Sequence, residues 1–259
     1  MTSVSGSGER ILAILDLFSE DRPEWQPDEM MRQLGYSRTT LYRYLKTLKD
    51  AGYLVSLPYS GFVLGPRVTE LDFLMRRSDP MIDAGAPHLK QLAARFPSSV
   101  FLVRWYGRKL LCIASEVSAS QPLTSYPRGR PMPLGRGAIS RAIVAFLPTR
   151  ERRALVTDFL DTFVQTGQGE TVEDVLATLR RVRRDGHATA KGEVTPGVIG
   201  VAAPILAGDS SPLGALCLTS DARDVIPPTL KSIETDVQRA AAAVSAQLGF
   251  TITPMQSIA

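Results

Sequence analysis

The stretch from Pro27 to Gly61 constrains the fold of this chain more than any other part of it. It contains two helical segments, Asp28 to Leu34 and Arg38 to Lys49, separated by a short turn. Ser37 is a favourable N-cap, and Gly52 is a favourable residue just past a helix C-terminus. The sequence therefore marks both ends of the second helix and predicts a helix-turn-helix.

The second helix has one apolar face and one basic face. Its apolar residues recur at helical spacing and predict a buried stripe of Leu41, Tyr44, Leu45 and Leu48. The opposite face carries hydroxyl, aromatic and basic side chains, and no acidic residue occurs in the helix before Asp50. Such a face suits phosphates and base edges, although an ordinary solvated helix surface can have the same composition. The flanking sequence decides between these two interpretations.

The residues after Gly52 predict a β-hairpin. Two apolar runs, 53–55 and 62–64, flank a turn-rich segment at 56–61. Helix, turn, basic helix and hairpin in this order predict a winged helix-turn-helix that binds DNA. We expect its DNA-contacting residues to be Ser37, Arg38, Thr39, Thr40, Tyr42, Arg43, Lys46, Tyr59 and Ser60.

The charge of this region does not itself favour DNA. Residues 1–66 contain seven Lys and Arg against eight Asp and Glu, a formal charge of −1, whereas the whole chain has +4. The prediction therefore depends on where the basic side chains lie and not on how many there are.

A chain of 259 residues is long enough for two domains. No signal-peptide pattern and no run of about 18 apolar residues is present, so we expect a cytoplasmic protein without a membrane segment. Cys112 and Cys217 both lie in apolar runs, which indicates buried thiols and no structural disulfide. With two histidines and no paired cysteines, metal-site spacing is absent, and we expect neither metal nor cofactor.

The segment from Pro66 to Ser78 predicts a linker helix. It has an apolar stripe of Val68, Leu71, Leu74 and Met75. A small winged domain offers this stripe little cover. We therefore expect the helix to pack against its counterpart in a second copy of the chain.

The rest of the chain has an α/β pattern. Helices are predicted at 81–96, 138–146, 150–160, 172–184 and 228–247, and strands at 100–104, 109–114, 198–206 and 213–218. Strands joined by hairpins, with helices before, between and after them, predict an antiparallel sheet covered by helices. The predicted fold class is α+β with two domains.

Several segments resemble the IclR family of bacterial transcriptional regulators, over essentially the whole chain. Residues 36–54 are similar to its recognition helix, and 62–66 to its wing exit. Residues 133–148 match, without gaps, the family segment P-L-H-A-T-A-L-G-K-A-L-L-A-F-L-P, and 186–205 match G-Y-A-V-D-x-E-E-x-x-x-G-V-x-C-I-A-A-P-I. The order and spacing of these segments make the resemblance specific.

The resemblance implies a GAF-like domain that binds a small organic acid, in a protein that assembles as a homodimer or homotetramer on palindromic double-stranded DNA and controls catabolic genes. In related regulators the backbone N–H groups at the start of one helix hold the effector carboxylate, and here these fall on Ala138 and Ile139. The first amides of a helix are unpaired, and the helix dipole favours an anion there.

This chain departs from the family pattern at three pocket positions. The family's Asp, Cys and Ser correspond to Ala190, Gly200 and Cys217, which predicts a larger and less polar pocket that fits an aromatic carboxylate better than glyoxylate or pyruvate. Arg136, beside Gly137, replaces a usually neutral residue. It could bind the carboxylate, or it could pair with Glu193 or another buried acid instead.

The predicted organisation is a winged domain at 1–65, a linker helix at 66–79, an effector domain at 80–250 and a C-terminal tail at 251–259. One alternative is a DNA-binding protein whose second domain only oligomerises. An enzyme is disfavoured, because the sequence lacks a nucleophile elbow, a P-loop and a dinucleotide fingerprint.

Overall fold

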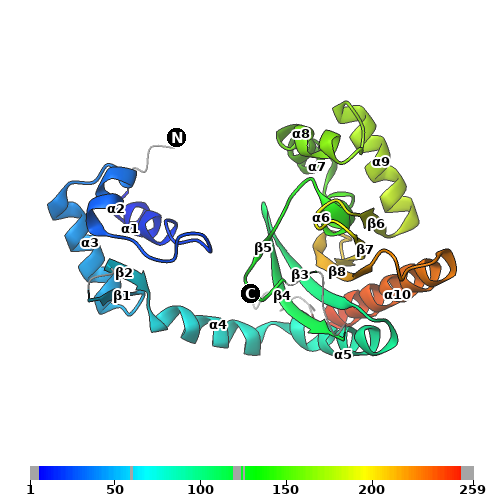
Figure 1. Cartoon of the computed structure of the whole chain (residues 1–259), viewed down its shortest axis with the longest axis horizontal. Helices are drawn as coiled ribbons and strands as arrows, with labels where there is room; N and C mark the ends of the chain where they lie inside the picture. Colours follow the sequence, from blue (N-terminus) through cyan, green and yellow to red (C-terminus); the bar gives the residue numbers. More distant parts are fainter. Residues whose placement is uncertain (1–5, 59–60, 119–123, 125, 252–259) are drawn as a thin grey trace, which may run out of the picture. The chain divides into compact units, whose positions relative to one another are not determined.

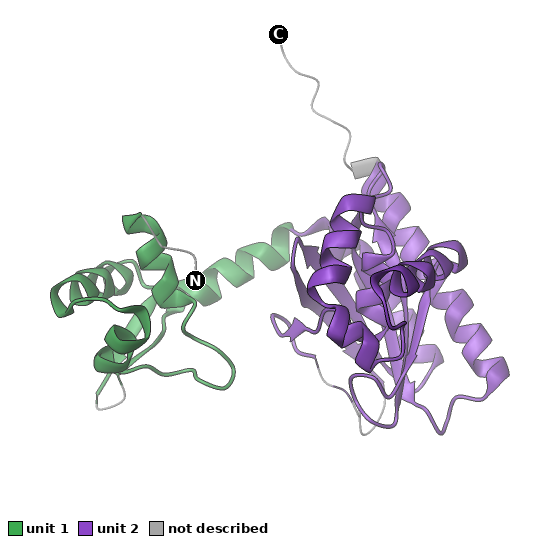
Figure 2. Cartoon of the chain, turned by 90° about the horizontal axis from the view of Figure 1, so that it is seen from above, with its two compact units in different colours: residues 1–78 green, residues 79–259 purple. Residues whose placement is uncertain are grey.

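The computed structural model describes residues 6–58, 61–118, 124 and 126–251. The chain forms two compact units, residues 1–78 and 79–259 (Figure 2).

The first unit is a winged helix-turn-helix followed by a further helix (Figure 1). Its elements are α1 (Ser7–Leu15), α2 (Pro27–Leu34), α3 (Arg38–Asp50), β1 (Leu54–Leu57), β2 (Gly61–Leu64) and α4 (Pro66–Ser78). The side chain of Ser37 caps α3 by accepting a hydrogen bond from the Thr40 amide at 3.3 Å. Gly52 follows the helix end with φ +77°, a conformation that glycine adopts without strain.

One small core holds the winged domain together. It includes Ile14, Trp25, Met30, Leu41, Tyr44, Leu45, Leu48 and Leu54. The hairpin is tied to the helices by two backbone hydrogen bonds between Trp25 and Phe62. A Cβ at Gly61 would lie 2.4 Å from the carbonyl oxygen of Trp25, so this approach requires glycine.

Helix α4 has no buried residue in the described structure. Its exposed apolar side chains are Val68, Phe73, Leu74 and Met75. Three residues of the stripe predicted from the sequence, Val68, Leu74 and Met75, are therefore exposed in the single chain, and Leu71 is half-buried.

The second unit contains a six-stranded antiparallel sheet and six helices among its described residues. Its elements are α5 (Pro80–Arg95), β3 (Ser99–Tyr106), β4 (Lys109–Val117), β5 (Pro131–Met132), α6 (Gly137–Val144), α7 (Thr149–Asp158), α8 (Leu160–Gln165), α9 (Val172–Asp185), β6 (Ala188–Lys191), β7 (Val198–Leu206), β8 (Pro212–Asp221) and α10 (Pro227–Thr251). The strand order is β5-β4-β3-β8-β7-β6.

The two faces of this sheet have different partners. Helices α5 and α10 pack on one face, whose core includes Val100, Leu102, Val201, Ala203, Leu216 and Leu218. The alternate residues point to the other face, where α6 lies near β6, β7 and β8 (Figure 1). Ala138 and Ala142 of α6 pack there against Ala188, Ala190, Ala202 and Cys217. The candidate ligand site lies on this second face.

Two further findings bear on the sequence predictions. No helix in the described ranges is long and apolar enough to cross a membrane. Cys112 and Cys217 are both buried free thiols, as the sequence predicts.

Candidate functional site

The exposed face of α3 brings together four of the nine residues predicted to contact DNA. Thr39, Tyr42, Arg43 and Lys46 are exposed, and their spacing places them on one side of the helix. The opposite side is buried in the winged core. Arg43 and Lys46 therefore present cationic groups to solvent from a rigid helix.

The other predicted residues of this face have local roles or lie elsewhere. The hydroxyl of Ser37 donates to that of Thr40 at 2.9 Å, so both take part in capping α3. Arg38 is exposed, and its guanidinium carbon is 5.6 Å from the centre of the Tyr42 ring. Tyr59 and Ser60 lie outside the described residues.

The second unit contains a cavity between α6 and the sheet. About 60 Å³ of it is open to the centre of a water molecule, and about 540 Å³ is free of protein atoms when its opening to solvent is counted. Strand register places Ala190, Gly200 and Thr219 side by side across β6, β7 and β8. Phe101 and Cys217 are paired in the neighbouring row. All seven residues that the sequence predicts for the effector pocket line this cavity: Arg136, Gly137, Ala138, Ile139, Ala190, Gly200 and Cys217.

Gly200 leaves space in the floor of the cavity. A Cβ there would make ordinary contacts, at 3.5 Å from Thr219 Cγ2 and 4.0 Å from Cys217 Sγ. The position can therefore accept a side chain without a backbone clash. Any larger side chain would extend into the cavity.

The start of α6 forms one end of the cavity. Gly137 has φ +79°, and a Cβ there would lie 2.8 Å from Val194 Cγ2, so both the backbone and the close approach of the 192–197 loop favour glycine. The Gly137 amide donates to Glu193 Oε2 at 2.9 Å. The amides of Ala138 and Ile139 have no acceptor within the described part of the chain.

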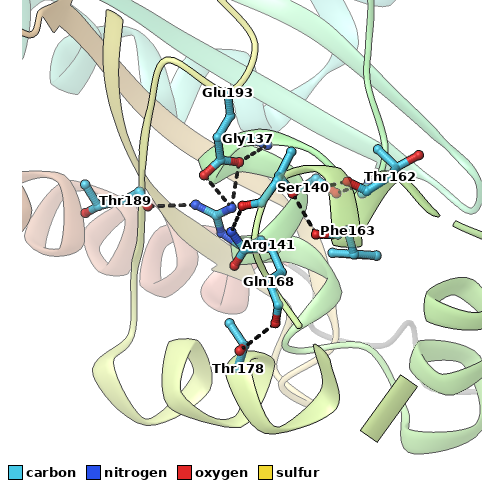
Figure 3. A network of polar contacts seen from close by, with 11 residues as sticks. Gly137, Ser140, Arg141, Thr162, Phe163, Gln168, Thr178, Thr189 and Glu193 are labelled. Atoms are coloured by element: carbon cyan, nitrogen blue, oxygen red, sulfur yellow. Dashed lines mark hydrogen bonds and ion pairs between the residues drawn. The ribbon is translucent and has the colours of Figure 1, made fainter. Parts of the chain in front are cut away.

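Glu193 is held by a buried ion pair (Figure 3). Arg141 Nη1 lies 2.8 and 2.7 Å from its two carboxylate oxygens, and Arg141 Nη2 donates to the carbonyl of Thr189 at 2.7 Å. The Arg141 side chain is only 4% exposed. The alternative that Arg136 pairs with Glu193 or another buried acid is not found among the described residues, where Glu193 pairs instead with Arg141, one turn into α6.

Arg136 differs from Arg141 in having an unsatisfied donor. Its Nε is buried and has no hydrogen-bond partner in the described structure. Buried donors without a partner cost free energy, so this nitrogen is available to an acceptor that enters the cavity.

Several lining residues were not predicted from the sequence. Phe101 and Tyr126 form an edge-to-face aromatic pair with ring centres 5.7 Å apart at 87°. The hydroxyls of Thr124 and Thr219 are hydrogen-bonded at 2.8 Å. Thr219 could have been found from strand alternation, two residues after Cys217. Tyr126 could not, because it follows a Pro- and Ser-containing segment without periodicity.

The cavity has few groups that ionise near neutral pH. Burial raises the pKa of the Tyr126 phenol and raises the pKa of the Cys217 thiol far above its usual range, so both are neutral. Within the described ranges, no group of three or more His, Cys, Asp or Glu side chains could hold a metal ion.

Comparison with protein families gives the same two-part division. Residues 7–58 match the IclR helix-turn-helix domain, and residues 76–246 match the C-terminal domain of the bacterial transcriptional regulator IclR. The chain belongs to the IclR family. Members of this family are transcriptional regulators, so the protein is a DNA-binding regulator and not an enzyme.

Individual relatives cover nearly the full chain. The transcriptional regulator XynR of Escherichia coli is 28% identical over 246 residues, 94% of this chain and 97% of its own. A crystal structure assigned to the IclR regulators, from a Silicibacter species, has a TM-score of 0.81 at 22% identity and covers 94% of this chain and 96% of its own. An IclR homologue from Microbacterium hydrocarbonoxydans, solved with 4-hydroxybenzoate, has a TM-score of 0.76 at 18% identity and covers 94% and 99%.

Proposed function

We propose that this regulator responds to an aromatic carboxylate bound between α6 and the sheet, and that it controls catabolic genes from a pseudo-palindromic operator. The observation that carries the ligand proposal is a cavity with unpaired N–H donors at one end and mainly apolar walls elsewhere.

The carboxylate end is formed by the start of α6. The amides of Ala138 and Ile139 and the buried Nε of Arg136 are donors without acceptors among the described residues. A helix N-terminus carries a partial positive charge, and an arginine can bind a carboxylate through two parallel hydrogen bonds. Together they supply enough hydrogen-bond donors and positive charge to bind one carboxylate.

The rest of the cavity fits an apolar body. Phe101, Tyr126, Met132 and Val198 line it, and aromatic rings favour edge or offset contacts with another ring. Ala190 and Gly200 place no polar side chain on the floor, which favours an apolar ligand body over glyoxylate or pyruvate. The homologue solved with 4-hydroxybenzoate is a distant relative that shares the fold, and its ligand belongs to the class proposed here.

We also propose that the predicted residues of α3 contact DNA in the major groove, and that the GAF-like effector domain and α4 form a homodimer or homotetramer. The exposed basic face of α3 and the exposed apolar residues of α4 support these assignments.

A thermal-shift titration of the full chain tests the ligand. Benzoate and 4-hydroxybenzoate should raise the melting temperature, since a ligand at a hundredfold excess over Kd stabilises the folded state by about 2.7 kcal/mol. Glyoxylate and pyruvate should do much less. The proposal fails if the small polar acids shift the melting temperature and the aromatic acids do not. If no acid changes the melting temperature, the result favours the alternative that the second domain only oligomerises.

Two matched variants locate the binding site. Gly200→Asp places a charged side chain in the cavity and should abolish the ligand-induced shift, while operator binding without ligand persists. Gly208→Asp makes the same change in a turn where a Cβ meets nothing, and it should retain the shift. An unchanged response in Gly200→Asp would place the ligand elsewhere.

A further inference from the structure

The ionisable groups of the cavity leave one uncompensated positive charge. Its lining contains one cation, Arg136, and one anion, Glu193. Directly behind Glu193, Arg141 forms an ion pair in which its Nη1 contacts both carboxylate oxygens. Because Glu193 and Arg141 neutralise each other, the remaining charge is that of Arg136.

The other polar groups that line the cavity are neutral. They are the hydroxyls of Thr124, Thr195 and Thr219, the phenol of Tyr126 and the thiol of Cys217. Arg130 and Lys191 are nearby cations, but both are exposed to solvent and neither lines the cavity. A second anionic group on a ligand would therefore find no cation among the described lining residues.

Glu193 also keeps Arg141 from pairing with a second negative charge. Its side chain is 14% exposed, and the Gly137 amide and Arg141 hold its carboxylate at the edge of the anion end of the cavity. A second ligand anion would therefore enter a poorly solvated site with no cation to pair with, and a buried charge without a partner has a large desolvation cost.

We propose that this charge balance makes the cavity selective for singly charged carboxylates over dicarboxylates and phosphate monoesters, with Glu193 as the specificity-determining residue. This inference rests on the proposed binding of an aromatic carboxylate. It adds that the net charge of the ligand, and not only its shape, determines binding.

Two ligands of nearly equal shape isolate the effect of charge. Terephthalate has a second carboxylate where 4-carbamoylbenzoate has a neutral amide. At pH 7.5 terephthalate is doubly ionised, because ordinary carboxyl pKa values are about 4. The meta isomers, isophthalate and 3-carbamoylbenzoate, provide a second pair. Calorimetric titration of the full chain at constant ionic strength should show the monoanion binding at least about tenfold tighter in each pair that binds. Equal affinities within a pair overturn the proposal.

Variants of the ion pair test the role of Glu193. Glu193→Gln leaves Arg141 as a second cation, and it should reduce the preference for the monoanion at least about threefold, since the dianion gains a partner. The double substitution Arg141→Met with Glu193→Gln removes both charges, leaves the net charge of the site unchanged, and should retain the preference. A preference that is the same in all three proteins would show that Glu193 does not set it.

The same titrations separate this inference from the function on which it rests. Binding of benzoate together with equal binding of mono- and dianions would refute the charge selection alone. Failure of benzoate and of every substituted benzoate would refute the aromatic carboxylate as ligand, and the inference with it.

Discussion

At the scale of single residues, two arginines five positions apart show how environment sets a role. Arg141 is almost fully buried and has its guanidinium paired with Glu193 and the Thr189 carbonyl. Arg136 occupies the N-cap position of the same helix without a side-chain capping bond, and its buried Nε has no acceptor among the described residues. Loss of Arg141 would leave a buried carboxylate without its partner. Loss of Arg136 would remove a donor that the folded chain does not use.

Substituting Arg136 by Met should therefore affect the ligand more than the fold. We expect a loss of affinity for benzoate of at least about tenfold, because a hydrogen bond to a charged group in a site shielded from water contributes about 1.5 to 3 kcal/mol. The melting temperature without ligand should change little. Arg136→Lys should restore part of the affinity. A large drop in melting temperature with unchanged ligand preference would show that Arg136 is structural.

On the recognition helix, Arg43 and Lys46 should have separable roles. Arg43→Ala should lower specific affinity by about 1 to 3 kcal/mol and relax base preference, if the arginine reads a guanine edge. Lys46→Ala should weaken binding to all sequences and flatten the salt dependence, as expected for a phosphate contact. Fluorescence anisotropy with operator and random duplexes over a range of salt measures both. If both variants bind operator DNA as the parent protein does, α3 is not the recognition helix.

The two thiols should be unreactive in the folded protein. Burial raises the pKa of Cys112 to about 11 and that of Cys217 further, so the reactive thiolate is rare at pH 8. Mass spectrometry after brief iodoacetamide treatment should find neither cysteine modified, and both modified in urea. Rapid labelling of the native protein would mean that one of them reaches solvent.

At the scale of elements, the sequence predicts what has periodicity and marked ends. Helix α3 begins after Ser37 and ends before Gly52 as expected, and the long strands β7 and β8 contain the predicted apolar runs. The short elements β5, α8 and β6 were not predicted. They have two, six and four residues, too few for a periodic pattern, and tertiary contacts determine their conformation.

The same limit applies to the cavity. The residues of its floor could be predicted from the family resemblance, which aligned Ala190, Gly200 and Cys217 with pocket positions. The pairing of Glu193 with Arg141 could not be predicted, because it joins the loop after β6 to the middle of α6, 52 residues apart in sequence. Sequence spacing does not determine which of two nearby arginines reaches a given carboxylate.

The cap of α3 gives a prediction at the element scale. Ser37→Ala removes the acceptor for the Thr40 amide and should destabilise the winged domain by about 1 kcal/mol. Urea unfolding in a Trp105→Phe background, in which Trp25 is the remaining tryptophan, reports on this domain. Thr47→Ala, at an exposed position of the same helix, is the control and should change stability by less than about 0.5 kcal/mol. Equal effects would show that the cap contributes nothing specific.

At the scale of the whole molecule, the winged domain carries little net charge, and its helix α4 exposes apolar side chains. Phe73, Leu74 and Met75 are 57, 53 and 50% exposed in the single chain. A monomer would expose this apolar surface to water. Exposed apolar patches often mark contacts between proteins. Self-association through α4 would cover the surface and also place two recognition helices on one DNA duplex.

We therefore expect at least a dimer in solution and a pseudo-palindromic operator, since two-fold protein symmetry is mirrored in the half-sites. Light scattering at micromolar concentration should give at least twice the 28.2 kDa chain mass. Met75→Glu places a charge within the apolar stripe of α4 and should weaken assembly and operator affinity together, because each half-site then binds a protomer without help from the other. Thr69→Glu adds the same charge next to Phe73, on the side opposite the stripe of Val68, Leu71, Leu74 and Met75, and should leave both unchanged if that stripe alone forms the contact. A parental protein that stays monomeric on and off DNA would refute the two-fold arrangement, whereas a dimer that Met75→Glu does not weaken would place the contact outside α4.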